Sequence, residues 1–263
     1  MKCSLIITTY NWPEALELSI LSVFEQSKLP DEIIIADDGS TDETKNLVEK
    51  LSKKSPIPLI HSWQDDRGFR ASRSRNLAIA RSKNNYIILI DGDMILHKNF
   101  VNDHISNSKD GCFIQGSRVI ITKKKSKKVL LSKQLTFCFL EKGLKNRLNA
   151  IHNNIFKFFF KTYTKSHEGI KTCNISFFKN DCINVNGFNE EFIGWGREDS
   201  EYVERLYNSG IQRKNIKFNC VAYHIWHNEN SRNFLCINDD ILQKAIDEKS
   251  KWCDNGINKY MEV

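Results

Sequence analysis

A short apolar stretch that ends in two aspartates constrains the fold of this chain more than any other feature. Residues 86–95 read YIILIDGDMI, and the aliphatic run 87–90 predicts a strand buried on both faces. Asp91 and Asp93 follow where the strand must end. Open α/β sheets bind ligands at the carboxyl ends of their strands, and Mg²⁺ and Mn²⁺ prefer oxygen ligands. The stretch therefore predicts a metal or ligand site, with an Asp-Gly-Asp surface turn as the alternative.

Strand and helix patterns alternate over the first part of the chain. Residues 3–11 predict a first strand that runs into a loop, residues 33–36 and 56–60 predict two further strands, and helical patterns lie between them. With the strand at 87–90, this order predicts a mostly parallel α/β sheet flanked by helices. The chain contains neither Gly-x-Gly-x-x-Gly nor a Walker sequence, so we do not expect a dinucleotide or an ATP P-loop.

An arginine-rich segment precedes a helix that we expect at residues 77–81. Residues 67–76 read RGFRASRSRN and contain four arginines. A helix N-terminus and nearby guanidinium groups suit an anion such as a diphosphate, so Arg75 and Asn76 are candidates for a nucleotide site. A solvated basic loop is the alternative.

Three motifs in order resemble the family 2 glycosyltransferases. Residues 6–11 read IITTYN, residues 35–42 read IADDGSTD and residues 91–93 read DGD. The resemblance covers roughly residues 1–110, and it implies a GT-A fold: one Rossmann-like mixed sheet, mostly parallel, that binds a nucleotide-diphosphate sugar. It implies Asp93 as a metal ligand and Asp37 and Asp38 as contacts of the base and ribose. The residues it implies on the nucleotide-sugar side are Thr8, Tyr10, Asp37, Asp38 and Asp91.

The segment 117–165 is far more basic than the rest of the chain. It holds 13 lysines and arginines and one acid, Glu141, so it carries +12 and the remainder carries 7 − 12 = −5. A nucleic-acid partner is not indicated, because the acidic remainder would repel phosphates. We expect a basic helical insert whose aromatic and basic side chains contact an anionic membrane surface. A lid or acceptor-side helix with inward-facing aromatics is the alternative.

A tryptophan between two glycines precedes several acids. Residues 192–201 read FIGWGREDSE. Acids at a helix N-terminus are ordinary caps, but capping does not explain the Gly-Trp-Gly sequence. Glycines around a tryptophan favour a flat ring offered to a ligand, and sugar C–H faces pack on aromatic rings.

Residues 170–230 resemble the galactosyltransferase-type segment of β-1,4-galactosyltransferases and of bacterial chondroitin and hyaluronan polymerases. That family carries Gly-Trp-Gly-x-Glu-Asp, in which the second acid is the catalytic base and the Trp and Glu bind the acceptor. The resemblance implies that Asp199 is the base. It implies that Trp195, Gly196 and Glu198 bind the acceptor.

Two histidines, His224 and His227, follow the last expected strand at residues 216–223. A lone histidine is usually structural, but two of them in a chain with Asp-Gly-Asp are candidate metal ligands. In β-1,4-galactosyltransferases a Met and a His at this spacing help to hold the metal. His227 matches that His, whereas the matching His of the polymerases lies closer to His224. The sequence leaves open which histidine binds.

Cysteine usage and hydropathy give the expected location. The eight cysteines include no Cys-x-x-Cys pair, which fits a reducing, cytoplasmic compartment. No run of 18 apolar residues occurs, and the N-terminal apolar run is too short for a signal sequence. We therefore expect a cytoplasmic protein, with peripheral attachment to an inner membrane as a further option.

Together these patterns predict a single GT-A domain over residues 1–263. Its expected parts are a nucleotide-sugar half at 1–110, the basic insert at 117–165, an acceptor and catalytic half at 170–230 and a helical tail at 231–263. The donated sugar, the acceptor and the oligomeric state are not specified by the sequence.

The predicted activity is inverting transfer of a hexose or N-acetylhexosamine from a UDP-sugar to a saccharide or lipid-linked saccharide. Mn²⁺ or Mg²⁺ is the expected cofactor, and lipopolysaccharide, lipooligosaccharide or capsule synthesis is the expected setting. A non-catalytic nucleotide-sugar or glycan-binding module of the same fold is the main alternative. A glycosidase would need no nucleotide site, and a nucleotidylyltransferase would show a glycine-rich loop after the first strand.

Overall fold

The main sheet has eight strands in the order β3-β2-β1-β4-β10-β6-β11-β9. The structure is a computed structural model that describes residues 1–155, 161–166, 169–228 and 231–261. Four neighbouring strands are parallel, as the sequence predicts: β1 (Cys3–Thr9), β2 (Glu32–Asp37), β3 (Leu59–Trp63) and β4 (Tyr86–Asp91). The mixed part contains β6 (Cys112–Gln115), β9 (Lys161–Thr164), β10 (Asn174–Phe178) and β11 (Gln212–Ile216).

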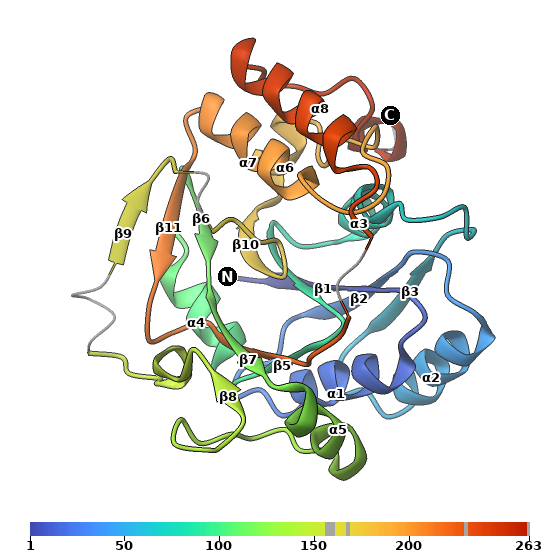
Figure 1. The fold of residues 1–263 in the computed structure, drawn as a ribbon, viewed down its shortest axis with the longest axis vertical. Coiled ribbons are helices and arrows are strands. Elements are labelled where there is room, and N and C mark those ends of the chain that lie inside the picture. The colour runs from blue at the N-terminus through green and yellow to red at the C-terminus, as the bar shows by residue number, and fades with distance from the viewer. Residues whose placement is uncertain (156–160, 167–168, 229–230, 262–263) are drawn as a thin grey trace.

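Helices cover both faces of this sheet (Figure 1). The first face packs against α1 (Pro13–Phe24), α2 (Asp42–Ser52) and α4 (Phe100–Asn107). The opposite face packs against α3 (Ala71–Arg81), α6 (Lys179–Asn184) and α7 (Glu198–Asn208). In Figure 1, α8 (Leu235–Asp247) lies beside α7.

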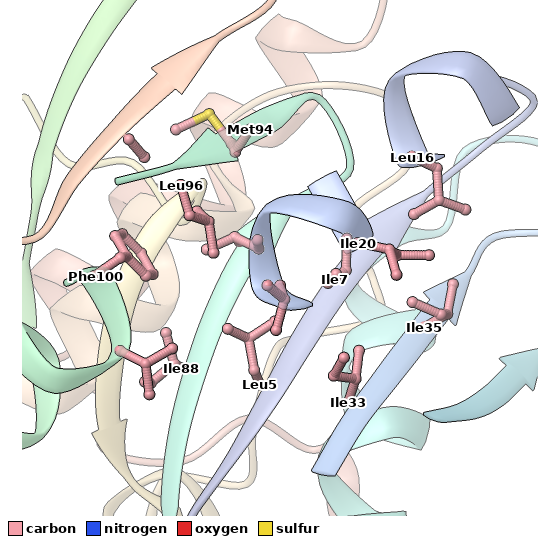
Figure 2. Close-up of a cluster of buried hydrophobic side chains, with 14 of the residues drawn as sticks. Leu5, Ile7, Leu16, Ile20, Ile33, Ile35, Ile88, Met94, Leu96 and Phe100 are labelled. Atoms are coloured by element: carbon pink, nitrogen blue, oxygen red, sulfur yellow. The ribbon is translucent and has the colours of Figure 1, made fainter. Parts of the chain in front are cut away.

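Alternation along the central strands explains why both faces are apolar. Leu5 and Ile7 of β1 point toward Leu16 and Ile20 of α1, as Figure 2 shows. Ile6, between them in the chain, belongs to the core on the other face. Successive side chains of a strand point to opposite faces, so a strand covered on both sides is a continuous apolar run.

A second sheet of four strands, which the sequence analysis did not predict, has the order β5-β12-β7-β8. Its strands are β5 (Met94–Leu96), β7 (Ser117–Ile121), β8 (Leu144–Lys145) and β12 (Val221–His224). Strand β5 begins directly after Asp93, and β12 ends at His224 opposite Met94. The backbone N–H of Ile225 also donates to the carbonyl of Asp93 at 2.9 Å. This pairing brings the Asp-Gly-Asp turn to the histidine segment.

Three segments differ from the sequence-based expectations. The helix expected at 77–81 begins six residues earlier, at Ala71. The described residues of the basic segment 117–165 contain one α-helix, α5 (Lys123–Ser132), together with strands and a 3₁₀ turn at Arg147–Ala150. Residues 156–160 of that segment, on which part of the expected membrane contact rests, lie outside the described residues. The last expected strand is divided between β11 and β12.

The described residues contain no helix that is long and apolar enough to cross a bilayer. All eight cysteines are free thiols.

Candidate active site

A cavity of about 940 Å³ opens at the carboxyl ends of β1 and β4. Every residue singled out from the sequence lines this cavity, with the exceptions of Asp37 and Asn76. Its walls come from the strand ends, the first turns of α3 and α7, and the loop after β12. The fold therefore gathers into one place residues that are more than 200 positions apart in the chain.

Asp93 and the two histidines form the cluster best suited to a metal ion. The Nε2 atoms of His224 and His227 each lie 3.2 Å from Asp93 Oδ2, and one ligand atom of each residue lies within 4.8 Å of the others. Asp93 Oδ1 is buried and has no hydrogen-bond partner among the described residues. An unpaired buried carboxylate oxygen is costly, and a cation would satisfy it. One carboxylate and two imidazoles are a donor set that fits a divalent transition metal.

Arg75 connects acids on the two sides of the cavity. Its buried guanidinium lies 3.8 Å from Asp91 Oδ1 and 3.3 Å from Glu198 Oε1. Burial alone would lower the pKa of Arg75, but the charges of Glu198 and Asp91 hold it above its usual value. Asp91 Oδ1 also accepts a hydrogen bond from Thr8 Oγ1 at 2.8 Å. Asp91 is thus fixed between the ends of β1 and β4 by an alcohol and a cation.

The consecutive acids Asp37 and Asp38 have different environments. Asp38 lines the cavity, accepts from the backbone N–H of Arg70 at 2.7 Å, and has a pKa raised to about 6 because it is buried. Asp37 does not reach the cavity. It is fully buried, and its two oxygens are occupied by the backbone N–H of Ser40 and by His61 Nε2, both at 2.8 Å. Of the two predicted contacts of the base and ribose, only Asp38 is accessible to a ligand in the cavity.

Asn76 also lies outside the cavity, because α3 starts at Ala71 and places Asn76 on its buried face. Its side-chain amide donates to the carbonyl of Phe188 at 2.7 Å and to Glu190 Oε1 at 2.8 Å. Its Oδ1 accepts from the backbone N–H of Phe188 at 2.8 Å. Asn76 therefore ties α3 to the segment before α7, and the predicted nucleotide contact of Asn76 is not seen in this geometry.

Glycines shape the loop that presents Trp195. Gly194 has φ +69°, and a Cβ there would lie 2.6 Å from the Phe234 ring, so a side chain is excluded on two grounds. Gly196 has φ +110°, and its carbonyl accepts from Asn238 Nδ2 at 2.9 Å. The Trp195 side chain remains 40% exposed at the cavity wall. This loop offers an aromatic face to a ligand while its backbone is held by α8.

Asp199 lies in the first turn of α7, beside Glu198 and within the influence of Arg75. Burial, and then the charge of Glu198, raise the pKa of Asp199 to about 7, while Arg75 opposes this shift. A carboxyl group with a pKa near neutrality is suited to accept a proton from a substrate hydroxyl. Its environment resembles that of a general base more than that of a helix cap.

Four cations that were not predicted as site residues also line the cavity, namely Arg118, Lys171, Arg197 and Arg232. Arg118 lies in β7 and Lys171 lies just before β10, and both line the wall near Cys173. Neither belongs to a recognisable motif, and Arg118 is one of many basic residues in its segment.

Comparison with protein families agrees with this geometry. The sequence model described as "Glycosyl transferase family 2" matches residues 4–167. A second model, described as "N-terminal domain of galactosyltransferase", matches residues 154–228. The two matches together cover the strand-end acids, the Gly-Trp-Gly loop and both histidines.

Two bacterial polysaccharide synthases are among the similar curated proteins. Chondroitin synthase from Escherichia coli is 26% identical over 237 residues, which cover 84% of this chain and 34% of the relative. Hyaluronan synthase from Pasteurella multocida is 27% identical over 237 residues, which cover 84% of this chain and 24% of the relative. The chain thus spans about a third or less of the length of these relatives.

Solved structures show the same fold. S. aureus TarS 1–349 in complex with UDP superposes with a TM-score of 0.60 at 17% identity, covering 95% of this chain and 68% of that chain. The mannosyltransferase PcManGT from Pyrobaculum calidifontis, in complex with GDP-Man and Mn²⁺, gives 0.55 at 14% identity and covers 85% and 56%. The predicted α/β fold of GT-A type is thereby confirmed.

Proposed function

Because the chain belongs to glycosyl transferase family 2, we propose that it transfers a hexose or N-acetylhexosamine from a UDP-sugar to a saccharide acceptor with inversion. The observation that carries the proposal is one cavity that holds both a metal-type cluster and a carboxylate with a pKa of about 7. Such a cavity can hold the leaving group and activate the acceptor in the same reaction.

Inverting transfer requires a single displacement, and therefore one base. We assign this role to Asp199, which would take the proton of the acceptor hydroxyl. The exposed ring of Trp195 and the carboxylate of Glu198 would orient the acceptor beside it. Arg75 holds Glu198 in place and keeps some negative charge on Asp199 by opposing the rise in its pKa.

On the nucleotide side, Thr8, Tyr10, Asp38, Arg75 and Asp91 line the part of the cavity at the ends of β1, β2 and β4. We propose that these residues contact UDP. Asp93, His224 and His227 would hold Mn²⁺, or Mg²⁺ in its place. When bound, the ion supplies positive charge for the departing diphosphate. The orphaned oxygen of Asp93 supports this assignment.

The described part of the basic segment supports attachment to an anionic membrane surface. Leu131, Leu140, Leu148 and Ile155 are largely exposed among its lysines and arginines. Apolar side chains surrounded by cations bind acidic lipid interfaces. We therefore place the enzyme in assembly of lipopolysaccharide, lipooligosaccharide or capsule, on a saccharide or lipid-linked saccharide at the inner membrane. Failure to sediment with anionic liposomes at low salt would contradict this placement.

The test of the proposal is the variant Asp199→Asn, assayed for UDP release from a panel of UDP-sugars with saccharide acceptors. We expect turnover to fall by at least about a hundredfold, because one general base contributes that much. Nucleotide affinity should be unchanged, since Asp199 lies on the acceptor side. Wild-type turnover in this variant would refute the assignment. No turnover by the native protein on any donor, together with intact UDP binding, would favour a non-catalytic binding module.

A further inference from the structure

Two cations in the cavity, Arg118 and Lys171, make no ion pair with a carboxylate of the described residues. Two other arginines that line the cavity, Arg75 and Arg197, differ in this respect. Arg75 pairs with Asp91 and Glu198, and Arg197 lies 2.5 Å from Asp239.

The backbone holds the two cations on the same wall. Asn174 Nδ2 donates to the carbonyl of Ser117 at 3.0 Å, which places the start of β7 beside the start of β10. Gln115 accepts from the N–H of Lys171 at 3.1 Å and donates to its carbonyl at 2.9 Å. Arg118 Nη1 lies 3.8 Å from the Sγ atom of Cys173, two residues after Lys171. Both side chains therefore project from fixed positions into the cavity.

The charges of the two side chains affect each other. The pKa of Lys171 is lowered, first by burial and then by the positive charge of Arg118. Two neighbouring cations that form no ion pair with a carboxylate destabilise each other, and an anionic ligand between them would remove that cost.

Their position identifies the part of the substrate that they can reach. In the main sheet, β10 adjoins β4 on the side opposite to β1 and β2. Thr8 and Asp38 follow β1 and β2, so the nucleotide side lies across Asp91 from Lys171. Lys171 is also within electrostatic reach of Asp199. The two cations consequently face the place where the donor sugar meets the acceptor.

We propose that Arg118 and Lys171 bind an acidic group, a carboxylate or a phosphate, on one of the two sugars that meet at Asp199. This inference rests on the proposed glycosyl transfer, and it makes the enzyme selective for an acidic sugar as donor or as acceptor. Arg118 and Lys171 act as specificity-determining residues, because they contact a group that is not itself transformed.

The experiment compares sugars that differ only at C6, with Mn²⁺ present. One arm measures the affinities for UDP-glucuronate and UDP-glucose. In the other arm the protein is saturated with UDP. Ligand-observed NMR then measures the affinities for methyl glucuronide, methyl glucoside and methyl glucoside 6-phosphate. We expect an acidic sugar to bind about tenfold more tightly than its neutral partner in one arm, as a charged hydrogen bond provides. The arm with the preference identifies the acidic sugar as donor or acceptor.

Arg118→Gln and Lys171→Gln should each abolish most of this preference and leave the affinity for UDP unchanged. Lys171 is on the exposed edge of the cavity, so its variant is expected to fold even if the Arg118 variant does not. Lys124→Gln, which removes an exposed cation of α5 outside the cavity, is the matched control and should retain the preference.

Two outcomes would overturn the inference. Equal affinities for acidic and neutral sugars in both arms would show that no acid is recognised. Loss of UDP affinity itself in both variants would show that the cations bind the diphosphate. If the native protein binds no UDP at all, the proposed glycosyl transfer is contradicted. Recognition of an acidic group can still be tested separately, by comparing the binding of methyl glucuronide and methyl glucoside without a nucleotide.

Discussion

The molecule contains two clusters of histidine and aspartate with similar composition and different chemistry. The cavity cluster is Asp93, His224 and His227, and the buried cluster is His97, Asp103 and His152. In both, one ligand atom of each residue lies within 4.8 Å of the others. Residue types and proximity therefore do not distinguish the two clusters. They differ in whether the aspartate has an oxygen lone pair free for a metal ion, as the hydrogen-bond partners of each aspartate show.

In the buried cluster the aspartate is already satisfied. Asp103 Oδ2 accepts from the backbone N–H of Cys220 at 3.0 Å, and both oxygens lie within 3.1 Å of His152 Nε2. The rings of His97 and His152 are stacked, with centroids 4.4 Å apart and an angle of 19° between their planes. An imidazole binds a metal through a lone pair that lies in the plane of its ring. Because the two rings are stacked, a cation in the plane of one ring lies outside the plane of the other, so both cannot bind it. We therefore interpret the buried cluster as structural, in contrast to Asp93 with its free Oδ1.

The largest expected difference is in stability. Asp103→Ala should lower the free energy of unfolding by about 3 kcal/mol, because it removes the buried carboxylate that contacts His152 and accepts from the N–H of Cys220. Chemical denaturation measures this change, with Asp103→Asn as the milder control. The Mn²⁺ dependence of UDP binding should be unaffected. A metal requirement that disappears in Asp103→Ala, with the fold intact, would reverse the interpretation of the two clusters.

The converse change is Asp93→Ala, which should reduce Mn²⁺-dependent UDP affinity by about a hundredfold with little loss of stability. The reason is that Asp93 supplies the charged ligand, and its removal relieves an unpaired buried oxygen. Calorimetry measures the affinity, and Asp254→Ala, at an exposed site outside the cavity, is the control. Unchanged affinity would remove Asp93 from the proposed metal site.

Acid should act on the buried cluster. Burial, and then the charge of His152, lower the pKa of His97 to about 4, against about 6.5 when unfolded. The unfolded chain then binds more protons, so this contribution is complete above pH 6.5 and is lost toward pH 4. Near pH 5 the loss is about 1 to 2 kcal/mol.

The effect of His97 must be measured as a difference between two proteins. The raised pKa values of Asp199 and Asp38 increase the free energy of unfolding as the pH falls over the same range, which opposes the effect of His97. Comparing unfolding of the native protein and His97→Gln between pH 7 and pH 5 isolates the histidine. Charged groups facing it are His152, Asp103 and Lys98. Parallel pH profiles for the two proteins would contradict a neutral, partly buried His97.

The smallest expected effect separates the two histidines of the cavity cluster. His224 ends β12 and is 14% exposed, whereas His227 lies in the following loop and is 38% exposed. A ligand fixed by a strand loses less freedom on binding. We expect His224→Ala to weaken Mn²⁺ binding about tenfold and His227→Ala to weaken it less. Titration of Mn²⁺ at fixed UDP, followed by electron paramagnetic resonance, would show the order, and the reverse order would assign His227 as the stronger ligand.

The strand-end acids and the histidines could be predicted from the sequence because each belongs to a short motif. Asp37 shows the limit of that approach. Successive side chains of a strand point to opposite sides, so the pair Asp37-Asp38 could place only one acid in the cavity. Which one depends on the neighbours His61 and Ser40, and the motif does not specify them.

Long-range pairing explains the other differences between sequence and structure. Strand β5 has three residues and pairs with β12 more than a hundred positions away, which no local pattern reveals. The Arg-Ser pattern at the start of α3 lacks apolar periodicity, so the helix start was wrongly predicted and no pattern indicated the burial of Asn76. Arg118 and Lys171 became visible only when β7 and β10 placed them on one wall.

Metal-dependent binding of UDP is tested most directly by calorimetric titration of UDP into the protein, first with Mn²⁺ and then with EDTA. We expect UDP to bind in the presence of Mn²⁺ and EDTA to weaken this binding strongly, because Asp93, His224 and His227 would then lack the cation that we propose they hold. UDP binding that is equally strong in EDTA would contradict the metal site, and no UDP binding under either condition would contradict the proposed function as a whole.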